Sequence, residues 1–253
     1  MLRTRVIPTL LLRNESLVKT KKFGRFTYIG DPCNTVRIFN ELEVDELMFL
    51  DITATKECRD PNYELLKDIA TECFMPLSYG GGVRSLEQAR KILNIGFEKV
   101  CINSVAFADL SVITAIANEF GSQAVVASID YKLRFWRKPE VIKGSNQKYT
   151  GKSVLAWAKD LESAGVGEIL LTSVDREGTW SGYDIEMIKK VAAAVSVPVI
   201  AHGGCGSVEH IGDVVNQGGA SAVALGSMVV FQKEGMGVLV NYPDEENLVS
   251  VLS

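Results

Sequence analysis

Residues 76–96 read PLSYGGGVRSLEQARKILNIG, and residues 198–218 read PVIAHGGCGSVEHIGDVVNQG. Aligned without gaps, both begin with a proline, contain a glycine pair, a serine and a glutamate, and end on an asparagine and a glycine. The two copies lie about half the chain apart, and such internal similarity is typical of a fold built from repeated units. We therefore interpret the chain as two similar halves, of about residues 1–120 and 121–253.

Around this repeat, short apolar runs alternate with longer amphipathic stretches. The runs are rich in Val, Ile and Leu, as in parallel strands that are buried on both faces. They span Arg5–Leu12, Glu46–Ile52, Pro76–Tyr79, Lys99–Asn103, Ala124–Asp130, Glu168–Thr172, Pro198–His202 and Ala222–Leu225. Helices are expected between them, with Ser85, Ser111, Ser153 and Ser207 as N-caps. Eight strand–helix units predict the α/β class and a (β/α)8 TIM barrel, a single domain over residues 1–253.

Composition narrows the class of protein. The chain has 253 residues, 47% of them hydrophobic, and a net charge of −4, which disfavours nucleic acid as a partner. No apolar run is long enough to cross a membrane, and the N-terminal residues do not resemble a signal peptide. The five cysteines form no C-x-x-C pair, and there are two histidines. We expect reduced thiols, no metal, no cofactor and a cytoplasmic location.

Glycine-rich turns follow several of the predicted strands. In a barrel the loops after the strands meet at one end, the mouth, where glycine turns and helix starts can bind phosphate. The first half offers Gly81, Gly82, Asn103 and Ser104, and the second half offers Gly203, Gly204, Gly226 and Ser227. This duplication predicts two phosphate sites and an elongated, phosphorylated small-molecule substrate. The alternative is that the glycines only form tight turns.

Three aspartates follow predicted strands and are candidates for general acid–base or binding roles: Asp51, Asp130 and Asp175. Asp130 is the strongest catalytic candidate, because an apolar strand runs directly into it. The other two could bind substrate hydroxyls or orient loops. The position equivalent to Asp130 in the first half is Leu11, so a pair of carboxylates related by the repeat is incomplete. A cysteine hydrolase using Cys205 and the nearby His202 is an alternative of another class.

Together these motifs resemble HisF, the cyclase subunit of imidazole glycerol phosphate synthase. The resemblance covers nearly the whole chain and rests on RVIPTLLL (5–12), YGGGVRSLEQAR (79–90), FGSQAVVASID (120–130), SVDREGTWSGYD (173–184) and VPVIAHGGCGS (197–207). It implies a partner, a class I glutaminase subunit, whose ammonia passes through the barrel. At the mouth, the ammonia reacts with a doubly phosphorylated ribulosyl aminoimidazole carboxamide, giving imidazole glycerol phosphate and AICAR.

The resemblance also assigns roles to individual residues. Lys19 matches a family lysine that closes over the substrate. Asp130 matches one of the family's two catalytic aspartates, and Leu11 replaces the other. Glu98 falls at the acidic contact to the glutaminase. The charged ring that serves as the family's ammonia gate falls on Arg5, Glu46, Lys99 and Glu168. A plain salt-bridge layer is the alternative for this ring.

The complete ring and the incomplete catalytic pair leave three hypotheses. The first is a synthase subunit that delivers ammonia to a phosphorylated acceptor or to a separate sugar amidotransferase, as in paralogues linked to surface-polysaccharide amidino sugars. Leu11 and the C-terminal segment LVNYPDEENL (239–248) resemble that branch. The second is a functional cyclase of histidine biosynthesis with another acid in place of the missing one. The third is a non-catalytic scaffold that activates its glutaminase.

Overall fold

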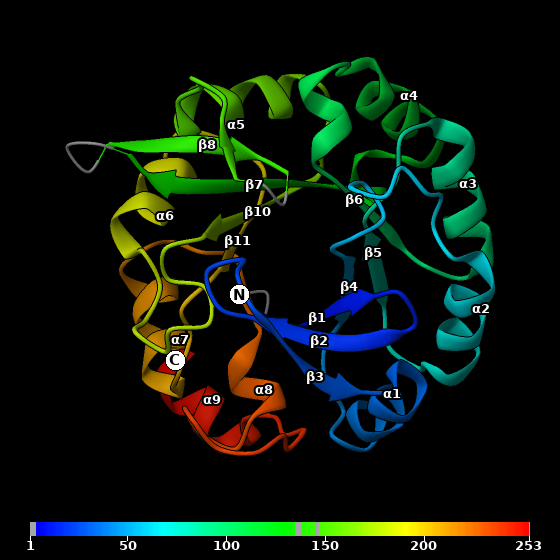
Figure 1. Ribbon diagram of the computed structural model, residues 1–253. Helices are drawn as coiled ribbons and strands as arrows, with labels where there is room; N and C mark the ends of the chain where they lie inside the picture. Colours follow the sequence, from blue (N-terminus) through cyan, green and yellow to red (C-terminus); the bar gives the residue numbers. More distant parts are fainter. Residues whose placement is uncertain (1–3, 135–137, 145–146, 253) are drawn as a thin grey trace.

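The computed structural model describes residues 4–134, 138–144 and 147–252 and confirms the predicted (β/α)8 barrel (Figure 1). Its closed wall consists of β1 (Arg5–Arg13), β4 (Leu47–Asp51), β5 (Leu77–Gly80), β6 (Lys99–Ile102), β7 (Val125–Leu133), β10 (Glu168–Ser173), β11 (Val199–His202) and β12 (Ala222–Leu225). These strands pair in parallel in chain order, and the β12–β1 pairing completes the circle. Each lies within three residues of its predicted bounds.

Helices surround the wall and cover its outer face. They are α1 (Pro32–Glu41), α2 (Tyr63–Glu72), α3 (Leu86–Ile95), α4 (Ser111–Phe120), α5 (Val154–Ser163), α6 (Ile185–Ala192), α7 (Val208–Asn216), α8 (Ser227–Val230) and α9 (Glu245–Leu252), with short 3-10 turns η1 (Ser104–Phe107) and η2 (Ser122–Ala124). Ser85, Ser153 and Ser207 occupy N-cap positions, as predicted. Ser111 does not: Leu110 holds that position, and the Asp109 carboxylate accepts the Ser111 N–H.

The barrel interior is stacked in layers along its axis. Side chains alternate between the two faces of each strand, so every second residue points inward. The middle layer is apolar and consists of Ile7, Met48, Cys101, Val126, Leu170, Ile200, Ala222 and Ala224. Charged residues lie at its N-terminal end and polar residues at its C-terminal end. The chemistry is therefore concentrated at the two ends of an apolar core.

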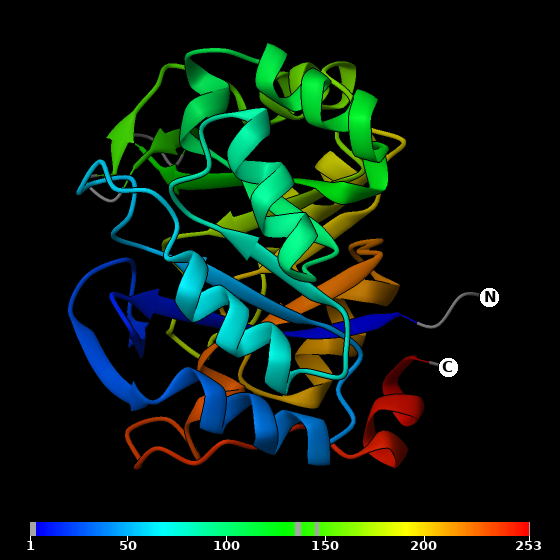
Figure 2. The ribbon, with the colours of Figure 1, turned by 90° about the vertical axis from the view of Figure 1, so that its right-hand side faces the viewer.

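Two hairpins extend the wall beyond the predicted strands. β2 (Ser16–Thr20) and β3 (Phe26–Gly30) follow β1, and β8 (Pro139–Lys143) and β9 (Lys148–Tyr149) follow β7. They arise after strands one and five, the equivalent positions of the two halves. Figure 2 shows the β2–β3 hairpin at the mouth, whereas both chain ends lie at the opposite, bottom face. Among the described residues, no helix has the length and apolar character needed to span a bilayer.

Candidate active site at the barrel mouth

Asp130 lies in β7 at the mouth, where its carboxylate faces a set of polar side chains. Asn103 donates from Nδ2 to Oδ2 of Asp130 at 2.7 Å, and the Ser128 hydroxyl donates to Oδ1 at 3.3 Å. Burial raises the pKa of Asp130 to about 6, although these hydrogen bonds act in the opposite direction. A carboxyl group with this pKa can take up or release a proton near neutral pH. The geometry therefore agrees with the predicted acid–base role.

Leu11 stands at the corresponding place in β1, across the barrel. It is buried, and it lies in register with Leu50 of β4 and Val18 of β2. Since Ile7 faces the barrel interior, strand alternation turns Leu11 inward too. This part of the mouth is apolar where the repeat would place a second carboxylate.

The second-half glycine turns and Lys19 form one pocket. Its wall contains Lys19, Glu177, Gly178, His202, Gly203, Gly204, Cys205, Ala224, Gly226 and Ser227. Gly203 has a φ of +92° and packs against the backbone of Ser173, so a side chain has no room there. The Lys19 ammonium lies directly over Gly226, only 2.5 Å from where a Cβ of that residue would be. The structure thus brings Lys19 together with four of the predicted phosphate-binding residues, Gly203, Gly204, Gly226 and Ser227. Phosphate binding at this pocket stays a prediction.

Glu177 and His202 are pocket residues to which the sequence assigned no binding role. Glu177 is fully buried, and its carboxylate pairs with the Lys19 ammonium at 3.2 Å. His202 ends β11, and its Nδ1 lies 3.1 Å from the Thr172 hydroxyl. Burial and the nearby Lys19 charge lower the pKa of His202 to about 3, so its imidazole is neutral. Glu177 lies two residues after Asp175, in the same loop. A loop has no alternating pattern of residues, so the direction of the Glu177 side chain could not be predicted from the sequence.

The first-half glycines have a different environment. The Gly82 N–H donates to the Thr55 hydroxyl at 3.3 Å, and a Cβ on Gly81 would lie 2.4 Å from the Asp51 carbonyl oxygen. Asp51 itself pairs with Arg59 at 2.8 Å and accepts N–H groups of its own loop. These contacts agree with the tight-turn and loop-orienting alternatives. A phosphate site in this half stays a prediction.

Three other candidates occupy distinct places at the mouth. Asn103 holds the N-cap position of η1 and Ser104 begins it, and Oδ1 of Asn103 is buried with no hydrogen-bond partner in the described part of the chain. That orphaned oxygen is available to a ligand. Asp175 accepts the Leu133 N–H at 2.8 Å, which joins the loop after β10 to the end of β7.

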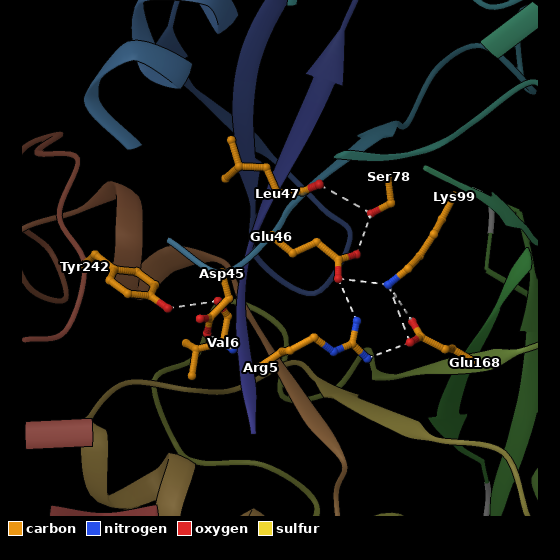
Figure 3. Close-up of polar contacts among 9 residues, drawn as sticks. All are labelled: Arg5, Val6, Asp45, Glu46, Leu47, Ser78, Lys99, Glu168 and Tyr242. Carbon is orange, nitrogen blue, oxygen red and sulfur yellow. Dashed lines mark hydrogen bonds and ion pairs between the residues drawn. The ribbon is translucent and has the colours of Figure 1, made fainter. Parts of the chain in front are cut away.

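At the bottom face, four charged side chains form a closed ring (Figure 3). Arg5 binds Glu46 and Glu168, each at 2.6 Å, and Lys99 binds the same two carboxylates at 2.9 and 3.2 Å. Each charge thus contacts two of opposite sign, and the Ser78 hydroxyl adds a contact to Glu46. Glu98 precedes Lys99 and is exposed beside this ring.

The hydrolase alternative does not fit this geometry. Burial raises the pKa of the Cys205 thiol to about 12, so it stays protonated, whereas a nucleophile requires the thiolate. Its sulfur contacts the Ser207 carbonyl oxygen and the Met228 sulfur, and the partner of His202 is Thr172. In the described part of the chain, no three His, Cys, Asp or Glu side chains form a cluster suited to a metal ion.

Comparison with known proteins identifies the family of the chain. The chain matches the family described as histidine biosynthesis protein over residues 5–234. The chain belongs to the HisF family. A Pseudomonas aeruginosa relative, provisionally named imidazole glycerol phosphate synthase subunit hisF2, is 50% identical over 98% of this chain and 99% of its own. Relatives from Leptospira borgpetersenii and Leptospira interrogans, provisionally named as subunit HisF, are 46% and 45% identical over at least 96% of both chains. The predicted HisF resemblance is thereby confirmed.

Proposed function

We propose that this HisF-family chain is the synthase subunit of a glutamine amidotransferase complex. A class I glutaminase binds the bottom face and releases ammonia there. The ammonia passes along the barrel and is used at the mouth by a phosphorylated acceptor, or is handed to a separate sugar amidotransferase of the amidino-sugar type. Glutamine is the nitrogen source, and no cofactor is required.

The observation that carries this proposal is the position of the charged ring at one end of an apolar core and of the glycine-lined Lys19 pocket at the other. Ammonia is neutral, and an apolar interior admits it far more readily than a charged ammonium ion. The ring closes the bottom end by paired charges that a local rearrangement can open. Arg5 is the most exposed of its members, with 29% of its side chain accessible, and is therefore the first candidate to move.

The delivery role is favoured over histidine-pathway cyclisation by Leu11. General acid–base chemistry on both sides of a substrate needs a titratable group on each side. Leu11 cannot exchange a proton, and Leu50 beside it is also apolar. The cyclase is the second candidate. It is supported by the names of the relatives, which are those of imidazole glycerol phosphate synthase subunits, and by the pKa of Asp130, which burial raises to about 6.

Turnover with the doubly phosphorylated ribulosyl substrate at saturating ammonium salt separates these candidates. We expect no detectable product from the unmodified chain, and a gain of product from Leu11→Asp. Turnover by the unmodified chain that Asp130→Asn abolishes would overturn ammonia delivery to another acceptor in favour of the cyclase. A scaffold role would leave glutaminase activation as the sole activity.

Complex formation with the cognate glutaminase tests the partner. Glu98→Lys reverses an exposed charge beside the ring, and we expect it to weaken binding at least tenfold in calorimetry. The matched control is Glu87→Lys, an exposed glutamate in the first turn of α3, near the mouth end of the barrel. Equal affinities for the two variants would place the glutaminase elsewhere.

Nitrogen transfer through the ring is tested in the assembled complex with amide-labelled [15N]glutamine. In Arg5→Ala we expect glutamine hydrolysis to continue while labelled nitrogen escapes to bulk solvent. Arg90→Ala, which removes an exposed pair with Glu119, is the control and should retain coupling. Unchanged coupling in Arg5→Ala would reduce the ring to a salt-bridge layer.

A further inference from the structure

Three titratable or hydroxyl-bearing residues cross the mouth in one row. Thr172 of β10 lies in register with His202 of β11 on one side and with Asp130 of β7 on the other. Each lies two or four residues after an inward-facing apolar residue of its strand (Leu170, Ile200 and Val126), so all three share the interior face of the wall. The row runs from the Lys19 pocket, which His202 lines, to the carboxyl group of the candidate acid–base residue.

The row is connected by one hydrogen bond and by strand register. The Thr172 hydroxyl lies 3.1 Å from His202 Nδ1, and the register of β7 and β10 sets Thr172 beside Asp130, whose pKa the hydroxyl lowers. A hydroxyl has one proton to donate and lone pairs to accept, so it can accept from one neighbour while donating to the other. On the pocket side, His202 Nε2 lies 3.9 Å from the position that a Cβ of Gly226 would occupy. Both ring nitrogens are therefore placed: one toward Thr172, the other toward the pocket.

We propose that His202 is the second proton-transfer residue of the mouth and that Thr172 connects it to Asp130. Nε2 takes a proton from a hydroxyl or amino group of the phosphorylated ligand. Nδ1 releases its own proton to the Thr172 oxygen, and the Thr172 proton passes to the Asp130 carboxylate. The imidazole ends neutral in the other tautomer, Asp130 ends protonated, and the ligand has lost one proton. This inference rests on the proposed function only for the nature of the ligand.

The charges around His202 favour this direction. Lys19 approaches from β2, Glu177 from the loop after β10, Asp130 through Thr172, and Cys205 contributes a neutral thiol from its own loop. Burial and Lys19 keep the imidazole neutral, which a relay through two tautomers requires. Asp130, with its pKa near 6, is the group in the row that can hold the transferred proton close to neutral pH.

This arrangement gives the mouth a second titratable group, although not on the side where Leu11 stands. The repeat predicts a second titratable group at the end of β1, and the residue there is apolar. His202 brings a titratable group to the mouth from β11 instead, next to the pocket that gathers most of the second-half binding residues. The pair Asp130 and His202 would thus act from one half of the barrel, in place of a pair divided between the halves.

Imidazole 15N NMR tests the connection directly, because the chain has only two histidines and His210→Gln assigns the other. When Asp130 is ionised it accepts the Thr172 proton, so Thr172 accepts from His202 and the Nδ1–H tautomer is favoured. When Asp130 is protonated the hydroxyl is free to donate to Nδ1, and the Nε2–H tautomer is favoured. We expect the tautomer ratio to change at least tenfold between pH 5 and 7.5, without formation of imidazolium.

Thr172→Val and Asp130→Asn should each abolish this pH dependence, and Thr172→Ser, which keeps the hydroxyl, should retain it. Circular dichroism and the unchanged His210 signals verify folding of each variant. A tautomer ratio that is constant in the unmodified chain, or that changes equally in Thr172→Val, would overturn the relay.

Adding inorganic phosphate distinguishes the relay from the proposed function. Phosphate in the pocket should shift the His202 signals and leave those of His210 unchanged. If phosphate has no effect while the Thr172-dependent change persists, the relay stands and the phosphorylated ligand of the proposed function is overturned.

Discussion

Glu177 fastens the β2–β3 hairpin over the pocket, and its removal should release the hairpin. One carboxylate oxygen binds the Lys19 ammonium at 3.2 Å and the Thr20 hydroxyl at 3.0 Å, and the other accepts the Phe23 N–H at 3.1 Å. The Lys19 side chain is 4% exposed and that of Glu177 is 2% exposed. In Glu177→Gln the single amide oxygen can serve only one of these two sides, and the ammonium loses its counter-charge.

The magnitude follows from these contacts. A hydrogen bond to a charged group contributes about 1.5–3 kcal/mol, and breaking a buried ion pair costs about 3–5 kcal/mol. Lys19 lies on the hairpin and can reach water once the hairpin opens, so we take about 3 kcal/mol as the change in opening free energy. That corresponds to about a 100-fold larger open population.

Limited trypsin digestion measures this population, because Lys21, Lys22 and Arg25 are exposed at the hairpin tip and cleavage follows the open state when closing is fast. We expect cleavage within the hairpin to accelerate about 100-fold in Glu177→Gln. Glu234→Gln is the matched control: it removes an exposed pair with Lys21 at 3.5 Å, and such pairs contribute at most about 1 kcal/mol. An acceleration of less than about fivefold in Glu177→Gln, or the same change in both variants, would refute the idea that Glu177 holds the β2–β3 hairpin closed.

Three further predictions concern stability and reactivity. Because burial raises the pKa of Asp130 from 3.8 to about 6, its protonated form is favoured in the folded state, and stability is lost as pH rises from about 4 through 6. Asp130→Asn should therefore have a higher free energy of unfolding than the unmodified chain, by on the order of 2 kcal/mol at pH 7 after allowing for water contact at the mouth. Urea unfolding across this pH range measures the difference, and a pH-independent difference would contradict this. Gly81→Ala places a Cβ against backbone at a φ of +117° and should cost more than about 3 kcal/mol, whereas Gly151→Ala, at +76° in open space, should cost about 1 kcal/mol; similar urea midpoints would show that the close approach relaxes. Iodoacetamide at pH 7.5 should label exposed Cys58 and leave Cys205, whose pKa burial raises, unmodified in peptide mass mapping; labelling of Cys205 in the folded chain would reopen the hydrolase interpretation.

The barrel could be predicted because its signals are local and repeated. Eight continuous apolar runs separated by amphipathic stretches leave few topologies, and all eight became wall strands. The hairpins were missed because their strands show no hydrophobic pattern from which the pairing could be predicted. Phe26 and Tyr28 of β3 are exposed, and β2 gains its burial from contacts with β1 and with the loop around Glu177. Ser111 was misplaced because α4 already begins at Ser111, after Leu110 as N-cap, and Asp109 accepts the Ser111 N–H.

The site was predictable to the extent that it depends on backbone. Glycine turns at strand ends converge at the mouth of any such barrel, and those of the second half line one pocket with Lys19. Partners that depend on side-chain direction could not be read from the sequence. The pairing of Lys19 with Glu177 joins β2 to a loop more than 150 residues later in the chain, and the row through Thr172 requires the register of three strands.

The two halves carry the same turn motif but have diverged in what surrounds it. In the first half, the glycines pack against a loop fixed by Asp51 and Arg59, and Leu11 removes the proton carrier. In the second half, the equivalent glycines remain beside a cation, and His202 adds a titratable group. The two half-barrels offer equivalent positions at the mouth. Concentrating the polar groups in one half leaves the other half free to accommodate a different acceptor. That asymmetry is the physical basis for expecting altered chemistry at the mouth, whereas the proposed ammonia passage rests on the charged ring and the apolar core.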